Sequence, residues 1–113
     1  MGIDFRTAMV TFARKARIDH SIFLALLAEA HLLAGQPLLG LAVADQGLDV
    51  PPKTGERFYE ADLHRIRGEI LLASEGTRHE GIEALQTALE VARRQGAGLL
   101  ENRAAASLRR HQG

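Results

Sequence analysis

Two stretches of this chain carry nearly the same sequence. Residues 23–35 read FLALLAEAHLLAG and residues 63–76 read LHRIRGEILLASEG, and they align when Glu69 is placed on Glu29. Further pairs recur at a separation of 41 residues, namely Gly35 and Gly76, Gly40 and Gly81, Leu48 and Leu89, Val50 and Val91, and Gly55 and Gly96. A period near 40 in a helical chain predicts stacked helical hairpins, because one hairpin cannot bury its apolar face alone.

Composition and periodicity both indicate helices. The apolar share of 46% comes mostly from Leu and Ala, and no segment alternates with the period of two that marks a strand. Apolar residues at steps of three and four mark a first helix over residues 3–17, namely Phe5, Ala8, Met9, Phe12, Ala13 and Ala16. The sequence therefore predicts an all-α fold of about six helices, stacked as antiparallel hairpins in a right-handed superhelix.

Helix punctuation divides the rest of the chain. Asp19 or Ser21 can cap a second helix that ends at Gly35, and Pro37 can begin a short third helix that stops before Pro51 and Pro52. A fourth helix is expected over residues 57–74 and is closed by Gly76, and a fifth reaches Arg94. A last helix is expected over residues 99–111. Thr77 and Glu80 have the spacing of a capping box at the start of the fifth helix.

The length of 113 residues is that of one domain. We expect a single domain over residues 1–113, made of a flanking helix (1–18), a first repeat (19–52), a second repeat (53–95) and a terminal helix (96–113).

Small residues and glycines recur at matching places in the two copies. The first copy supplies Ala28, Gly35, Gly40, Ala44, Gly47 and Pro52, and the second supplies Gly68, Gly76, Gly81, Leu85 and Ala88. With this pattern the chain resembles the tetratricopeptide repeat family, in which small residues let two helices approach closely. It departs from the family where Ala44 replaces a bulky residue and where the second copy has no Pro.

A closer resemblance covers about residues 20–110. The segments GERFYEADLHRIRGEILL and EALQTALEVARRQGAGLLENRAAASL are similar to the C-terminal repeat region of large bacterial signalling proteins, which join a nucleotide cyclase or ATPase module to helical repeats. The resemblance implies a role in bacterial signalling or regulation without catalytic activity in this segment.

The residue types needed for catalysis or metal binding are not arranged for it. The chain has no Cys, which excludes disulfides, thiolate metal sites and Cys nucleophiles. Gly35 and Gly40 have the spacing of a phosphate-binding loop, but Leu41 and Ala42 follow where Lys and Ser or Thr are required. No two of the five His residues are separated by four, the spacing of a helical metal pair. We therefore expect no catalytic residue, no metal and no cofactor, and hence no enzyme.

Charge and hydropathy disfavour nucleic acid and membrane partners. Fourteen basic residues balance 14 acidic ones, so the whole chain has no field that would attract nucleic acid. The C-terminal third is locally basic, but Glu90 and Glu101 interrupt its arginines. The apolar run from Ile22 to Ala28 is far shorter than the roughly 20 residues of a membrane span. We expect a soluble, cytoplasmic protein.

The family resemblance implies where a partner would bind. First helices of the hairpins line the concave face in that family, which gives a candidate groove of Ile22, Ala25, Glu29, Leu32, Asp62, Arg65, Glu69, Leu72, Arg103 and Arg110. Such a surface suits an extended or helical peptide with apolar anchors, oriented by carboxylates that bind Arg65 and Arg103. The alternative is that Arg65 and Glu69 pair with each other at i, i+4 and only support their helix.

Two classes of function fit these features. The first is a non-catalytic scaffold module that mediates protein–protein or peptide interaction. The second is a regulatory module that senses a small ligand and acts on a cyclase, ATPase or DNA-binding partner. Because Phe5, Met9 and Phe12 have no complete preceding hairpin to cover them, a homodimer through the N-terminal helix is also expected.

Overall fold

The computed structural model describes residues 20–49 and 59–112, and within each of these ranges helices are joined by short turns. Their order is α2 (His20–Leu33), α3 (Pro37–Asp49), α4 (Glu60–Ala73), α5 (Arg78–Gln95) and α6 (Gly98–Gln112). No strand occurs in these two ranges, so the all-α prediction is confirmed, with five helices where about six were expected over the whole chain. The expected helix over residues 3–17, the cap at Asp19, and Pro51 and Pro52 lie outside the described residues.

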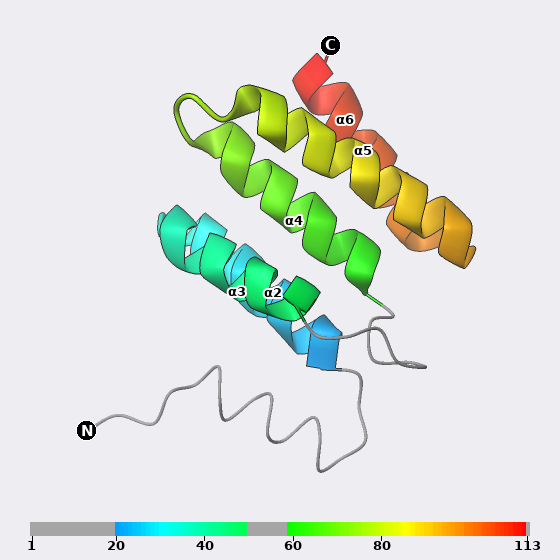
Figure 1. Ribbon diagram of the computed structural model, residues 1–113, viewed down its shortest axis with the longest axis horizontal. Helices are drawn as coiled ribbons and strands as arrows, with labels where there is room; N and C mark the ends of the chain where they lie inside the picture. Colours follow the sequence, from blue (N-terminus) through cyan, green and yellow to red (C-terminus); the bar gives the residue numbers. More distant parts are fainter. Residues whose placement is uncertain (1–19, 50–58, 113) are drawn as a thin grey trace.

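The helices stack as hairpins, with α4 in the middle of the stack (Figure 1). α2 packs on α3 and α4 packs on α5, each pair being joined by a short turn. The pattern of neighbours then repeats, since α3 packs between α2 and α4, and α5 packs between α4 and α6. As a result α2, α4 and α6 contact one another in succession, whereas α3 and α5 are not in contact.

The two hairpin turns explain why the repeat has two spacings. Gly35 and Gly76 adopt φ angles of +76° and +79°, the left-handed conformation that Gly provides beyond a helix end. The turn of the first hairpin consists of residues 34–36, and that of the second consists of residues 74–77. The second turn is thus one residue longer, so the helices before the turn match at a separation of 40 and those after it match at 41.

Close approach within each hairpin requires a glycine on the second helix. A Cβ atom on Gly40 would lie 2.9 Å from the carbonyl oxygen of Ala28, and one on Gly81 would lie 3.1 Å from the carbonyl oxygen of Gly68. Ala28 and Gly68 occupy the same place in the two copies, as do Gly40 and Gly81. The small residues of the sequence repeat therefore mark the same helix contact in both hairpins.

Two apolar clusters form the core of the described residues, and α4 contributes to both. The first cluster joins α2, α3 and α4 and contains Leu24, Ala25, Ala28, Val43, Ala44, Leu63, Ile66 and Ile70. The second joins α4, α5 and α6 and contains Ala61, Val91, Ala92 and Leu100. Both clusters thus include side chains of α4, and this helix joins the two hairpins.

The predicted capping box at the start of α5 does not form. Thr77 precedes α5, but its side chain makes no hydrogen bond that caps this helix. Instead the Thr77 hydroxyl donates to the carbonyl oxygens of Leu71 and Ser74, at 2.5 Å and 3.2 Å. The last carbonyls of a helix lack donors within the helix, so the short turn brings the hydroxyl to the end of α4 rather than to α5.

Candidate functional site

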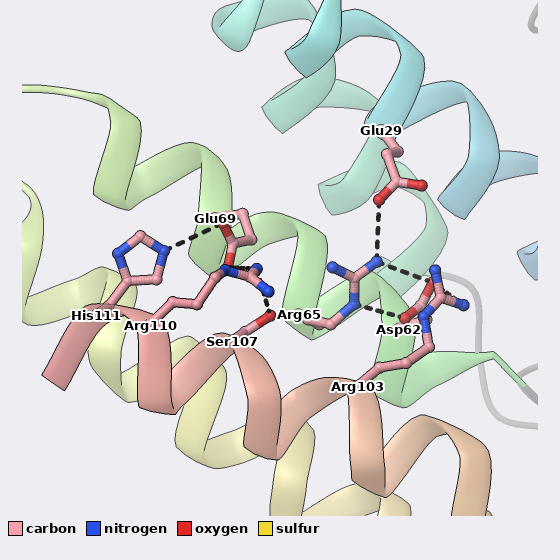
Figure 2. A network of polar contacts seen from close by, with 8 residues as sticks. All are labelled: Glu29, Asp62, Arg65, Glu69, Arg103, Ser107, Arg110 and His111. Atoms are coloured by element: carbon pink, nitrogen blue, oxygen red, sulfur yellow. Dashed lines mark hydrogen bonds and ion pairs between the residues drawn. The ribbon is translucent and has the colours of Figure 1, made fainter. Parts of the chain in front are cut away.

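Arg65 on α4 connects the first helices of the two hairpins. Its Nε donates to Oδ1 of Asp62 at 2.8 Å, one turn earlier on the same helix, and its Nη2 donates to Oε2 of Glu29 on α2 at 3.1 Å (Figure 2). The Arg65 and Asp62 side chains are 8% and 6% exposed. Because a buried charge is costly unless it is paired, the two carboxylates are what allow this guanidinium to be buried.

The same line of charges continues onto α6. Arg103 Nη1 lies 3.6 Å from Oδ2 of Asp62, so Glu29, Arg65, Asp62 and Arg103 alternate in sign across α2, α4 and α6 (Figure 2). We call these four residues the inter-helix charge network. It crosses the three helices that contact one another along one side of the stack.

A second group of polar contacts lies about one turn further along α4. Glu69 accepts a hydrogen bond from Arg110 Nη2 at 3.0 Å, and its other oxygen lies 3.2 Å from Nε2 of His111. Arg110 also donates to the Ser107 hydroxyl at 3.2 Å. Glu69 is therefore held by α6, whereas Arg65 is held by α2 and by its own helix (Figure 2).

The environment of Arg65 fixes its charge. Burial alone would lower the pKa of the guanidinium, but the hydrogen bonds and negative charges of Asp62 and Glu29 outweigh burial and raise the pKa above its ordinary value. Arg65 therefore carries its positive charge at neutral pH.

The structure brings the polar members of the predicted groove together but pairs them with one another. All six take part in the contacts above: Glu29, Asp62, Arg65, Glu69, Arg103 and Arg110. The alternative, in which Arg65 pairs with Glu69, is not what the structure shows. Arg65 binds Asp62 and Glu29, and Glu69 contacts Arg110 and His111. Arg65, which was expected to bind a carboxylate of a partner, is buried and already holds two carboxylates of its own chain.

The apolar members of the predicted groove differ in their exposure. Ala25 is buried in the first cluster, which corrects its assignment to an open groove, because its side chain faces the core. Leu32 is half-buried and packs against the same cluster, while Ile22 and Leu72 are also half-buried. Leu72 lies over α5, since its Cγ would be 2.6 Å from a Cβ atom on Gly81.

Ser107 and His111 belong to this site, although the sequence reasoning did not assign them to it. Both lie on α6 beside Arg110 and take part in the contacts with Glu69 described above. At a separation of 41, Ser107 and His111 of α6 occupy the positions that Ile66 and Ile70 occupy in α4, and the side chains of Ile66 and Ile70 face the preceding hairpin. The repeat therefore held the signal that these two side chains turn toward the stack.

The site offers charge and hydrogen bonds rather than a reaction centre. Among residues 20–49 and 59–112, no three His, Asp or Glu side chains are grouped so as to hold a metal ion. A membrane span would need a longer and more apolar helix than any in this part of the chain.

Comparison with known proteins finds one long match. The chain is 36% identical over 92 residues to the uncharacterized protein R02095 of Rhizobium meliloti (strain 1021). The match takes in 80% of this chain and 9% of that protein, so the matched segment is a small part of a much longer relative. No family model matches the sequence, and no solved structure matches it.

Proposed function

We propose that this chain is a non-catalytic helical-repeat module of the tetratricopeptide type that binds a protein or peptide segment along α2, α4 and α6. The supporting observation is the regular stacking of the hairpins, in which α2, α4 and α6 contact one another in succession and so share one continuous face. Stacked repeats commonly use such an extended face for binding.

The exposed members of the charged groups define the chemistry of the partner. The side chains of Arg103 and Arg110 are 37% and 59% exposed, in contrast to Arg65. A guanidinium carries five N–H donors, more than either side chain uses in its contacts with Asp62, Glu69 and Ser107. We propose that an acidic segment is oriented by Arg103, as the sequence had suggested, and by Arg110 in place of the buried Arg65.

A role in bacterial signalling or regulation, in the cytoplasm, forms part of this proposal. It is supported by the resemblance to the repeat regions of bacterial signalling proteins and by the match to a short segment of a much longer bacterial protein. A repeat module of this size would serve such an assembly by holding a partner or a neighbouring domain.

The test compares three forms of the purified chain as bait in lysate of its source cells. These are the wild type, the Arg103→Gln/Arg110→Gln variant, and an Arg94→Gln/Arg109→Gln control that removes the same charge from two exposed arginines outside the charged groups. Quantitative mass spectrometry should find a partner retained by the wild type and the control, and reduced about tenfold with the first variant, which corresponds to about 1.4 kcal/mol of binding. Equal retention by all three forms, with unchanged circular dichroism, would place binding elsewhere.

The alternative function predicts a different result in the same preparation. A module that senses a small ligand would retain this molecule on purification, and native mass spectrometry would show a constant mass increment. If this increment occurred without any retained protein, the sensing function acting on a cyclase, ATPase or DNA-binding partner would replace the binding function.

A further inference from the structure

α6 carries a row of exposed and half-buried side chains at helical spacing. Leu99, Arg103, Ala106 and Arg110 follow one another at steps of four, three and four, so they share one face of the helix. Leu99 is 67% exposed, Ala106 is half-buried, and both arginine side chains are exposed as described above. We call these four residues the α6 row. It lies beside α4, because two carboxylates of α4 contact its arginines (Figure 2).

The two arginines are held two helical turns apart. Arg103 and Arg110 are seven residues apart on α6, which corresponds to about 10.5 Å along a helix. Their partners on α4, Asp62 and Glu69, are also seven residues apart. The backbone of α6 and the carboxylates of α4 therefore impose the same separation on the two guanidinium groups.

Ala106 lies between the two arginines and leaves space on this face. At a separation of 41 residues it corresponds to Arg65 of α4, so α6 carries a methyl group where α4 carries a guanidinium. Small side chains let a second helix approach closely. The α6 row thus presents an apolar residue, a cation, a small residue and a second cation in order.

The separation of the two cations matches a helix better than a strand. In an α-helix, residues i and i+7 lie on one face and are about 10.5 Å apart. In a β-strand, residues on the same face are about 6.7 Å apart at i+2 and about 13 Å apart at i+4, so neither pair matches. Helical segments that bind to a surface commonly place their contacts at these helical spacings.

We infer that the acidic segment is an α-helix that lies along α6 and carries two carboxylates seven residues apart, one for Arg103 and one for Arg110. An arginine and a carboxylate can form two parallel hydrogen bonds, which favours carboxylates over other acceptors. An apolar residue four positions beyond the carboxylate at Arg103 packs against Leu99. This inference rests on the proposed function and adds the conformation and the residue spacing of the partner.

Three synthetic peptides test the spacing on the intact chain. Each has an Ala/Gln host sequence, acetyl and amide ends, two Glu and two Leu. The first has its Glu residues seven apart and a Leu four positions outside each Glu, so that either direction along α6 matches the row. The second has the same composition with its Glu residues five apart, which places them about 140° apart around the helix. The third repeats the first with Pro at its centre, which breaks the helix.

Fluorescence anisotropy at low salt measures the affinity of each peptide. The first peptide should bind the wild-type chain about fivefold more tightly than the second or the third. The Arg103→Gln/Arg110→Gln variant should remove this difference, and the Arg94→Gln/Arg109→Gln control should retain it. Leu99→Ala should weaken binding of the first peptide about threefold, because it removes an apolar contact.

The inference is overturned if the first peptide does not bind, or if the second or third binds as tightly as the first. Equal binding of the third peptide would favour an extended segment. The retention experiment with lysate tests the proposed function separately. A partner lost from the Arg103→Gln/Arg110→Gln variant in that experiment, together with equal binding of the three peptides, would retain the binding function and reject a helix of this spacing.

Discussion

Arg65 keeps its charge in nearly closed surroundings because two carboxylates from different helices share it. Glu29 comes from α2 and Asp62 from α4, so the guanidinium is fully paired only when these two helices are in their native register. A buried ion pair of this kind adds little net stability compared with apolar residues, but breaking it leaves an uncompensated charge. We therefore expect the inter-helix charge network to fix the alignment of α2 on α4 more than to hold them together.

Removing Asp62 should be much more harmful than removing an exposed carboxylate. The Asp62→Ala variant leaves buried Arg65 with Glu29 alone, and we expect the free energy of unfolding to fall by about 3 kcal/mol. The matched control is Asp45→Ala, which breaks the pair of Asp45 with Arg67. Because the Asp45 and Arg67 side chains are 48% and 35% exposed, this loss should cost less than about 0.5 kcal/mol. Urea denaturation of both variants measures the difference, and equal losses would show that burial of the network is unimportant.

The raised pKa of Arg65 predicts how stability responds to alkali. A group whose pKa is raised on folding contributes stability below its unfolded pKa, and this is lost only as pH rises through the folded value, which for Arg65 lies beyond the ordinary arginine range. The wild-type network should therefore persist at pH 10.5. A Lys ammonium cannot bind two carboxylates in the planar, forked manner of a guanidinium, so Arg65→Lys should lower the free energy of unfolding by about 1.5 kcal/mol at pH 7. Because Lys has an ordinary pKa of about 10.4, the loss should be larger at pH 10.5.

The comparison for Arg65→Lys is Arg67→Lys, which makes the same change at an exposed pair. Urea denaturation of both variants and the wild type at pH 7 and pH 10.5 separates the network from the other groups that ionise in alkali. A deficit of Arg65→Lys that stays constant over this range, or that Arg67→Lys shares, would contradict the assignment.

Some of these contacts could be predicted from residue spacing and others could not. The repeat register places Glu29, Arg65 and Glu69 on the first helices of successive hairpins, which the sequence analysis recognised. It could not choose the partner of Arg65, because Asp62 three residues before and Glu69 four residues after are both within helical reach. The structure adds Glu29 as a partner of Arg65. Glu29 is 36 residues away in the sequence and becomes a neighbour only when α2 and α4 pack.

Helices within a hairpin are held at the distance that their glycines permit. Gly81→Ala would place a Cβ atom 2.6 Å from Leu72 Cγ and 3.1 Å from the Gly68 carbonyl oxygen. The intrinsic preference of a helix for Ala is worth about 0.5–1 kcal/mol, but overpacking costs about 1–3 kcal/mol, so we expect net destabilisation by about 1–2 kcal/mol. Gly98→Ala on α6 meets no atom within 4 Å and should be neutral or slightly stabilising. Thermal denaturation of the two variants checks both signs, and a stabilised Gly81→Ala variant would contradict close packing there.

The ends of the helices could be predicted from the sequence where a residue type is required by the backbone conformation. Gly35 and Gly76 end the first helices as predicted, because a positive φ is a local requirement that few other residues meet. Thr77 did not follow its local pattern, because its hydroxyl can accept from α5 or donate to the end of α4, and the turn geometry selects the second. The buried position of Ala25 was missed because an apolar residue on a first helix fits either a groove or the core.

At the scale of the whole molecule, a substitution in α4 should affect the stability of both hairpins. Each cluster includes at least one buried residue of this helix, and α4 contacts the four other described helices. Stacked repeats unfold as units coupled only to their neighbours, so the effect of a core substitution depends on how many interfaces it touches. A central helix with two interfaces couples the units, whereas a terminal helix with fewer neighbours can separate from the rest.

Hydrogen exchange should distinguish a central substitution from a terminal one. Ile66→Ala removes a buried side chain of α4 and should destabilise by about 2–5 kcal/mol, so that the slowest amides of all the described helices exchange faster by a similar factor. Leu100→Ala removes a buried side chain of the second cluster, where α6 ends the described stack, and should speed exchange mainly in α6 and in the part of α5 that it contacts. If Leu100→Ala sped up amide exchange in α2 as much as in α6, the described helices would unfold as a single unit. This result would contradict the expectation that a terminal substitution acts mainly on its neighbouring helices.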